Sequence, residues 1–523
     1  MPRHPARDDD NAPDHPPGAG AGEQSPLLNH NPDADPNATE NAIDQQRSQL
    51  RPRLMFLVLA TVFGLELGVA MFTPPSAAIM ERILCRDFYP EFANGTSSAG
   101  WAPDGDCKIP GVQAPLAMLR GWLATIEAIP ALLSAMPWGI LSDRWGRKPV
   151  MVCGIVGLVL SLAFATLVYA FSDFVPLWTY WFSALFLFLG GGAQMIVAML
   201  YTFIADVTPV PERATAFFRL GAVYLASGMI ASPVAGALML KSPWLALIIA
   251  LAVMVLCIPL GLAFPETVHL HARQEPGGER EAPRGPGDTG TPEHGKPSAA
   301  SRYWTKAKGG AADVSDFILG NGAVCFLILS SIFVVLGKFV QELLLQYTTK
   351  RYGWSWSDAT FILTIRHAAS LVTLLVVLPS ASWFCVDRLG MQGVYKDLWL
   401  ARASAAFGAV GCLLVAAAPN GYFLAFAFLW MSLGAGISSL TRSLLNALVE
   451  EHHVGTLNSL ISFMETTGAL VAGPLLAESL SVGMEWGDSW IGLPFLVAGG
   501  FLGVATAILC VFRPPAQGTL SES

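Results

Sequence analysis

Twelve apolar stretches, each of about 20 residues or more, constrain this chain more than any other feature. A stretch of that length crosses a bilayer as a helix, because a helix satisfies its own backbone polar groups. Only 13% of the 523 residues are charged, against about 25% in ordinary soluble domains. The sequence therefore predicts an all-α membrane protein with 12 transmembrane helices. The expected spans are 54–78, 115–139, 148–171, 177–205, 213–239, 243–264, 317–342, 357–380, 397–418, 421–448, 455–480 and 490–512.

The segments outside the spans differ sharply in composition. Residues 1–53, rich in Pro, Asp and Asn, are expected to form a disordered cytosolic tail without a cleavable signal peptide. Residues 268–316, rich in Gly, Pro and Glu, are expected to form a flexible cytosolic linker. The linker separates an N-terminal six-helix half, 54–267, from a C-terminal six-helix half, 317–512, and a short cytosolic tail, 513–523, follows.

Basic residues near short loops predict the orientation. Arg51 and Arg53 precede the first span, and Arg144, Arg147 and Lys148 lie between the second and third. Basic residues also occur on the opposite side, so the bias is moderate. We expect both termini and the loop between spans two and three to be cytoplasmic.

The two halves repeat at an offset near 244 residues. The pattern DRxG at 143–146 returns at 387–390, and Asp206 at the end of span four matches Glu450 at the end of span ten. A Ser-Pro pair in span five matches a Gly-Pro pair in span eleven, slightly out of register. Three matches in chain order predict two pseudo-symmetric halves.

Residues 139–148, GILSDRWGRK, form the charged turn after span two. They match the motif G-x-x-x-D-R-x-G-R-R/K throughout, so the chain resembles the major facilitator superfamily over about residues 54–512. The resemblance implies a transporter that works by alternating access between its halves. Met391 and Gln392 replace the basic pair in the second copy, so any latch there should be weaker.

The chemistry of this turn suits a latch on the inner face. Gly139 permits close helix approach, and Asp143 can accept hydrogen bonds from a neighbouring helix N-terminus. Arg144 and Arg147 can pair with acids at other helix ends, with Asp206 as a candidate. The alternative is a topology signal alone. The expected gating residues are Gly139, Asp143, Arg144, Gly146, Arg147, Lys148, Asp206, Asp387, Arg388, Arg442 and Glu465.

Two shorter resemblances bear on the type of transporter. Residues 228–236, GMIASPVAG, resemble the antiporter motif of the superfamily, with Ser232 in place of a Gly and Arg219 near a missing one. This favours proton antiport over symport or uniport. The stretch 81–89, with 107–113, resembles a fungal subgroup of uncharacterised permeases and exporters.

Charged residues within the spans are candidates for binding substrate or protons, because a charge at mid-bilayer costs about 3 kcal/mol or more. Glu66 and Glu127 lie halfway along spans one and two. We expect them to couple protons or bind a substrate cation, the alternative being a structural hydrogen bond between helices. The further candidates are Gln194, Arg219, Arg366 and His367.

Two pairs of charges in the C-terminal half are expected to be ion pairs. Arg442 and Glu465 both fall in the inner half of their spans and are expected to close the inner gate. Lys338 and Glu342 are four positions apart, so they are expected to pair on one helix face near the outer surface.

The loop after the first span carries outward-facing features. Asn94 begins an NGT glycosylation acceptor on the permitted side. Cys85 and Cys107 flank the same loop on the oxidising side. A disulfide and two free thiols are equal alternatives.

The sequence favours a secondary active transporter, most simply proton-coupled efflux of a metabolite or drug-like compound. The alternatives are an uptake or vacuolar permease, by symport or uniport, and a transporter-like nutrient sensor. No nucleophile elbow, metal cluster or Walker motif supports an enzyme or an ATP-driven pump. The expected partners are a small-molecule substrate, protons and the bilayer, with no cofactor, metal or nucleic acid, and the chain is expected to be monomeric.

The expected membrane is the plasma membrane. An acidic dileucine pattern, formed by Glu23, Leu27 and Leu28, would instead send the protein to a vacuole-like membrane.

Overall fold

The computed structural model describes residues 36–89, 106–208, 210–266, 322–391, 393–448 and 454–512. Of the described residues, those from 47 onward belong to one unit, which carries the spans, and residues 36–46 belong to another. All regular structure in the described ranges is helical.

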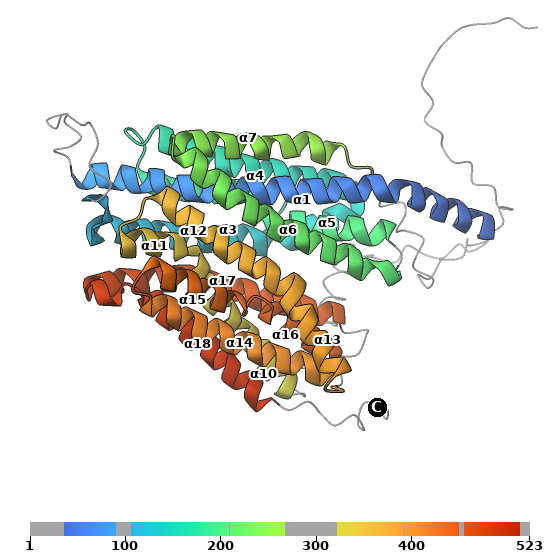
Figure 1. The fold of residues 1–523 in the computed structure, drawn as a ribbon. Coiled ribbons are helices and arrows are strands. Elements are labelled where there is room, and N and C mark those ends of the chain that lie inside the picture. Colours follow the sequence, from blue (N-terminus) through green and yellow to red (C-terminus); the bar gives the residue numbers. More distant parts are fainter. Residues whose placement is uncertain are drawn as a thin grey trace, which may run out of the picture. The chain divides into compact units, whose positions relative to one another are not determined.

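Six spans form the N-terminal half, drawn in blue to green in Figure 1. Its elements are α1 (Pro36–Phe88), η1 (Asp106–Lys108), α3 (Pro110–Trp145), α4 (Arg147–Ala170), η2 (Leu177–Phe188), α5 (Gly192–Val207), α6 (Val210–Met239) and α7 (Pro243–Leu262).

Six further spans form the C-terminal half, drawn in yellow to red. Its elements are α10 (Gly322–Lys338), η3 (Phe339–Glu342), α11 (Leu344–Tyr352), α12 (Trp356–Val372), η4 (Thr373–Val377), α13 (Leu378–Asp387), α14 (Gly393–Ala417), α15 (Gly421–Ser432), α16 (Ile437–Ala447), α17 (Val454–Glu485), η6 (Asp488–Trp490) and α18 (Leu493–Val511).

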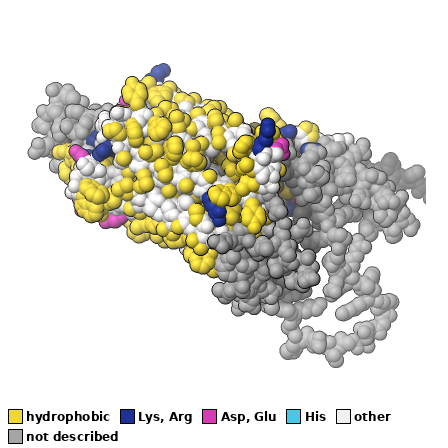
Figure 2. Space-filling view, turned by 60° about the horizontal axis from the view of Figure 1, so that its bottom comes forward, with side chains coloured by type: hydrophobic (Ala, Val, Ile, Leu, Met, Phe, Trp, Pro, Cys, Tyr) yellow, Lys and Arg dark blue, Asp and Glu magenta, His cyan; other side chains and the backbone are white. Residues whose placement is uncertain are grey.

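The twelve predicted spans are confirmed: the described helices include 12 that are long and apolar enough to cross a membrane. Hydrophobic side chains cover most of the described surface in Figure 2, as a surface facing lipid requires. The predicted span 243–264 is observed as Pro243–Leu262. The first helix runs ten residues beyond its predicted end at 78, to Phe88, and continues through Pro74 and Pro75.

Several spans are interrupted where the sequence supplies glycine or a tight turn. Span four passes from η2 into α5 through Gly190, Gly191 and Gly192, whose φ angles are 80°, 80° and 69°. Only glycine adopts this left-handed region without steric cost. Span seven changes from α10 to a short 3₁₀ turn at η3, and span ten is broken between α15 and α16.

The two halves pack against each other along two helix pairs, α3 with α17 and α6 with α12. Gly121 on α3 faces Gly473 on α17 so closely that a Cβ on Gly121 would lie 2.7 Å from the carbonyl oxygen of Gly473. Small residues permit such close crossings between membrane helices. Thr125 of α3 also donates to the carbonyl oxygen of Leu470 at 2.7 Å.

The bundle has two ends, named here from the predicted orientation. The inner end carries residues 139–149, and the outer end carries Cys85 and Cys107. The gating residues of the charged turn lie at the inner end, and the charges expected in mid-membrane lie between the two ends.

Candidate functional site

A buried ion pair ties helix ends together at the inner end of the N-terminal half. Arg147, at the start of α4, donates through its guanidinium to the carboxylate of Asp206 near the end of α5. Their side chains are only 6% and 1% exposed. Of the two arginines that the sequence proposed as partners of Asp206, Arg147 makes the ion pair.

Glu266 is a member of this group that sequence reasoning did not assign. Its carboxylate accepts hydrogen bonds from the backbone N–H groups of Arg147 at 3.0 Å and Lys148 at 3.3 Å. These are the first residues of α4, where the helix dipole favours an anion. Gly146 has a φ of 109°, and a Cβ there would collide with the Glu266 carboxylate. The glycine of the motif therefore makes room for this cap.

Other members of the charged turn contribute less to the described contacts. The side chains of Asp143 and Arg144 lie outside the described part of the structure, as does Glu450. The close helix approach expected at Gly139 is not observed, since no described atom lies within 4 Å of a Cβ placed there.

The second copy of the motif is exposed. Asp387 ends α13 and Arg388 follows it, and neither side chain bonds to another described residue. Nearby, Arg442 of α16 donates to Glu465 of α17 at 2.8 Å, with the side chains 40% and 29% exposed. Both partners belong to the same half, so this ion pair holds two helices of one half together and does not join the halves.

The two intramembrane acids of the N-terminal half lie where charges from both halves meet. Glu66 on α1 and Glu127 on α3 are partly buried, and neither accepts a hydrogen bond from another described residue. Glu127 is close enough to Glu342 of the C-terminal half to interact with it electrostatically. Tyr224 of α6 interacts in the same way with both Glu66 and Glu342.

Two arginines, one from each half, converge on η3. Arg120 of α3 donates to the carbonyl oxygen of Glu342 at 3.2 Å, and Arg366 of α12 donates to the side chain of Gln341 at 2.8 Å. Both also interact electrostatically with the Glu342 carboxylate. We call Glu66, Arg120, Glu127, Tyr224, Glu342 and Arg366 the central charge cluster.

The predicted pairing of Lys338 with Glu342 is wrong. The α-helix ends at Lys338 and η3 follows, so the spacing that stacks side chains four apart is lost. Lys338 instead donates to the carbonyl oxygen of Ala435 at 3.3 Å and to Ser438 at 2.9 Å, in the break of span ten. The break leaves Glu342 available to Arg120 and Arg366.

His367 belongs to a chain of hydrogen bonds between the halves. Arg366, which can only donate, bonds to Nε2 of His367 at 2.8 Å. Nε2 must therefore accept, and the imidazole proton sits on Nδ1, which donates to Ser232 of α6 at 3.0 Å. Ser232 in turn donates to the carbonyl oxygen of Gly228 at 3.1 Å. This arrangement orients Arg366.

Two further candidates stand apart from these contacts. Gln194 on α5 and Arg219 on α6 are exposed and make no hydrogen bond or ion pair with other described residues. Within the described ranges no group of His, Cys, Asp and Glu could hold a metal ion.

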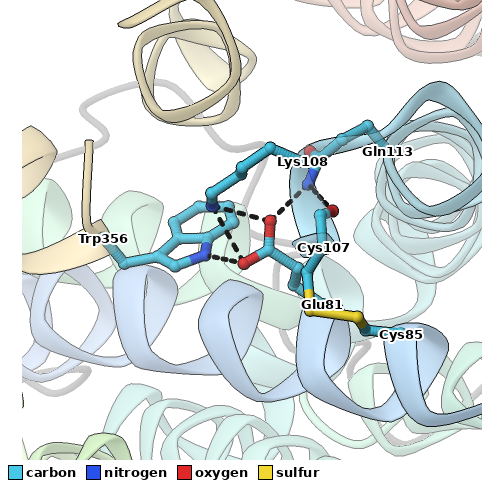
Figure 3. Close-up of a disulfide and its surroundings, with 6 residues drawn as sticks. All are labelled: Glu81, Cys85, Cys107, Lys108, Gln113 and Trp356. Atoms are coloured by element: carbon cyan, nitrogen blue, oxygen red, sulfur yellow. Dashed lines mark hydrogen bonds and ion pairs between the residues drawn. A yellow bond between two sulfur atoms is a disulfide. The ribbon is translucent and has the colours of Figure 1, made fainter. Parts of the chain in front are cut away.

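At the outer end, Cys85 and Cys107 form a disulfide (Figure 3). The possible glycosylation residue Asn94 and the sorting residues Glu23, Leu27 and Leu28 lie outside the described residues.

Comparison with known sequences decides the family. The profile of the Major Facilitator Superfamily matches residues 117–473. The chain belongs to this superfamily. The superfamily protein "MFS efflux pump atnC" of Emericella nidulans is 30% identical over 504 residues, covering 94% of this chain and 93% of its own.

Other members of the superfamily point the same way. "Efflux pump ustT" of Aspergillus flavus is 29% identical over 441 residues, covering 83% of both chains. The "Tetracycline resistance protein, class C" of Escherichia coli is 25% identical over 407 residues, covering 75% of this chain and 85% of its own. The predicted resemblance to a fungal subgroup of this superfamily is confirmed.

Solved structures of other transporters share the fold. The nucleoside transporter NupG aligns with a TM-score of 0.60 at 12% identity, covering 88% of this chain and 98% of its own. A D-xylose-proton symporter aligns with a TM-score of 0.57 at 13% identity, covering 88% of this chain and 98% of its own. At such low identity the likeness establishes the fold of this chain and nothing about its cargo.

Proposed function

We propose that this chain exports small organic molecules in exchange for protons, by alternating access between its two halves. One observation carries the proposal: Glu66 and Glu127 lie within membrane spans with no hydrogen-bonding partner among the described residues. A carboxyl group in a span costs about 3 kcal/mol on insertion scales. A structural role would supply a hydrogen-bonding partner from a neighbouring helix, and among the described residues neither acid has one.

The position of the two acids suits proton exchange. Glu127 interacts electrostatically with Glu342 of the other half, where Arg120 and Arg366 meet, and Glu66 interacts with Tyr224, which also interacts with Glu342. Their surroundings therefore change when the halves move. A carboxyl group that is exposed alternately to the two sides takes up a proton on one side and releases it on the other. If the ionised form binds the cargo and the protonated form releases it, protons drive export.

The relatives support the direction of transport. Two of the fungal relatives are named as efflux pumps, and a tetracycline resistance protein is among the bacterial ones. The proposed cargo is an organic molecule that offers hydrogen-bond donors or a positive charge to the carboxylates. We further propose that the protein works as a monomer in the plasma membrane.

The test uses intact cells that express the chain and are loaded with a mixed panel of small organic compounds, including tetracycline. Mass spectrometry measures what the cells retain, with and without a protonophore. We expect at least one compound to be lost faster from expressing cells, and the protonophore to remove the difference.

Glu127→Gln and Glu66→Gln should each slow this loss about tenfold or more. The matched control is Glu485→Gln, an exposed acid at the outer end of α17, which should export as the parent does. Export that survives the protonophore and both substitutions would sink the proton assignment. Accumulation of compounds in expressing cells would instead favour uptake, and binding without any flux would favour a sensor.

A further inference from the structure

Residues from the stretches 81–89 and 107–113 meet at the outer end, at the buried carboxylate of Glu81 (Figure 3). Glu81 of α1 accepts hydrogen bonds from Lys108 at 2.7 and 2.9 Å and from the side-chain amide of Gln113. It also accepts a hydrogen bond from the indole N–H of Trp356 at 2.5 Å. Glu81 is only 5% exposed. A buried carboxylate with this many donors is fully satisfied.

The donors come from different halves. Lys108 and Gln113 belong to the N-terminal half, as Glu81 does, whereas Trp356 is the first residue of α12 in the C-terminal half. The ammonium of Lys108 also lies 4.8 Å from the centre of the Trp356 ring, within range of a cation–π contact. Trp356 therefore docks onto an ion pair whose two members, Glu81 and Lys108, both belong to the N-terminal half.

The disulfide holds that ion pair in place. Cys85 lies one helical turn beyond Glu81 on α1, and Cys107 directly precedes Lys108. The Cys85–Cys107 bond therefore fixes the backbone that presents Lys108 against the helix that presents Glu81. Gln113 adds a tie to the same segment by donating to the carbonyl oxygen of Cys107 at 3.1 Å.

Two more contacts join the halves at this level. Gln346 of α11 donates to the backbone and side-chain oxygens of Gln113, at 2.8 and 3.2 Å. Lys350 of α11 donates to the carbonyl oxygen of Lys108. Gln346 is fully buried and Trp356 is 7% exposed. The outer side is sealed here by packed, hydrogen-bonded side chains.

The distribution of charge makes the seal reversible. Separating a buried ion pair leaves an uncompensated charge, which is strongly unfavourable. Here both members of the pair, Glu81 and Lys108, stay on the N-terminal half when the halves part. Opening breaks bonds from the neutral indole and amide groups of Trp356 and Gln346, and from Lys350, which lies toward the outer solvent. A permanent contact gains nothing from keeping both charges of the ion pair on one half. A gate requires this arrangement, because it must open without separating the two charges.

We propose that Glu81, positioned by the Cys85–Cys107 disulfide and Lys108, is the outer gate residue of the transport cycle, and that Trp356 is the side chain that docks on it to close the gate. The inference rests on alternating access in the proposed function. The disulfide acts through Lys108, so its members are positioning residues.

The experiment measures how readily the centre is reached from outside. The free cysteines are replaced by Ser, and Cys85 and Cys107 are kept; the replaced residues are Cys153, Cys257, Cys325, Cys385, Cys412 and Cys510. Tyr224→Cys, in the central charge cluster, reports access. A membrane-impermeant thiol reagent is added to intact cells, and the labelling rate is followed.

The parent reporter should label slowly. Trp356→Ala should speed labelling at least about tenfold, in line with the loss of a hydrogen bond to a charged group. Trp356→Phe, which removes the N–H and keeps the ring, should give a smaller increase. Glu81→Gln and the double change Cys85→Ser with Cys107→Ser should also speed labelling. The matched control is Trp486→Ala, which removes an exposed outer tryptophan that does not contact Glu81. It should label as the parent does.

Equal labelling rates in the parent, Trp356→Phe and the cysteine double variant would overturn the gate, even if Trp356→Ala failed to fold. The result is separable from the proposed function. Export is measured in chains that keep Tyr224. Accelerated labelling of the reporter without any export would keep the gate and reject proton-driven efflux, while normal export with unchanged labelling would reject the gate alone.

Discussion

The outer and inner ends of the bundle are held together in different ways. At the outer end, described hydrogen bonds cross between the halves, from Trp356 to Glu81 and from Gln346 to Gln113. At the inner end, the ion pair of Arg147 with Asp206 lies within one half. Contacts that join the halves at one end must break when that end opens, and contacts within a half can persist. The outer end is thus built to part, and the inner pairs keep each half rigid.

The largest expected effect is on the inner pair of the N-terminal half. Arg147→Ala leaves the carboxylate of Asp206 buried without its cation, which should destabilise the protein by about 3–5 kcal/mol. Thermal unfolding in detergent should show a large drop in midpoint temperature. Adding Asp206→Asn to Arg147→Ala should recover part of the loss. An unchanged midpoint temperature in the single variant would show that the ion pair of Arg147 with Asp206 is solvated and does not stabilise this half.

A medium effect is expected where the halves cross beside the central charge cluster. Gly121→Ala would place a Cβ 2.7 Å from both the carbonyl oxygen of Gly473 and the Cβ of Ala477. Overpacking of this kind costs about 1–3 kcal/mol, and it should push the halves apart. Gly500→Ala, whose Cβ meets nothing within 4 Å, is the control. Equal unfolding temperatures for the two variants would contradict the tight crossing.

The smallest effect is expected for the ion pair of the C-terminal half. Arg442 and Glu465 are 40% and 29% exposed, so solvent screens their attraction, and exposed pairs contribute about 0–1 kcal/mol. Arg442→Gln should therefore shift the unfolding midpoint far less than Arg147→Ala does. If the two variants unfold at the same temperature, the ranking of the two ion pairs by burial is wrong.

The spans could be predicted from the sequence because the bilayer sets their length and hydropathy. The motif and the charges at helix ends predicted an ion pair of Arg144 or Arg147 with Asp206, and the structure shows Arg147 in that pair. Glu266 could not be placed, since nothing local says that a residue 119 positions away caps α4. Glu342 was misassigned because helical spacing was assumed through the 3₁₀ turn at η3. Arg120 carried a usable signal, as a charge inside an apolar stretch.

The residues around Glu81 at the outer end show another limit of prediction from sequence. Glu81, Lys108 and Gln113 stood out only as part of a loop resemblance. Their common function depends on Trp356, about 275 residues further along the chain. No spacing rule connects residues in different halves, so only the folded structure reveals that they share one carboxylate.

The most direct test of the difference between the ends measures both ends in the same protein, by electron-spin distances between paired labels. One pair replaces the exposed outer residues Phe174 and Tyr422, and the other replaces the exposed inner residues Trp145 and Leu389. Introducing Trp356→Ala should lengthen the outer distance and shorten the inner one, because the halves rock about the centre. An outer distance that stays fixed, or two distances that lengthen together, would contradict the account.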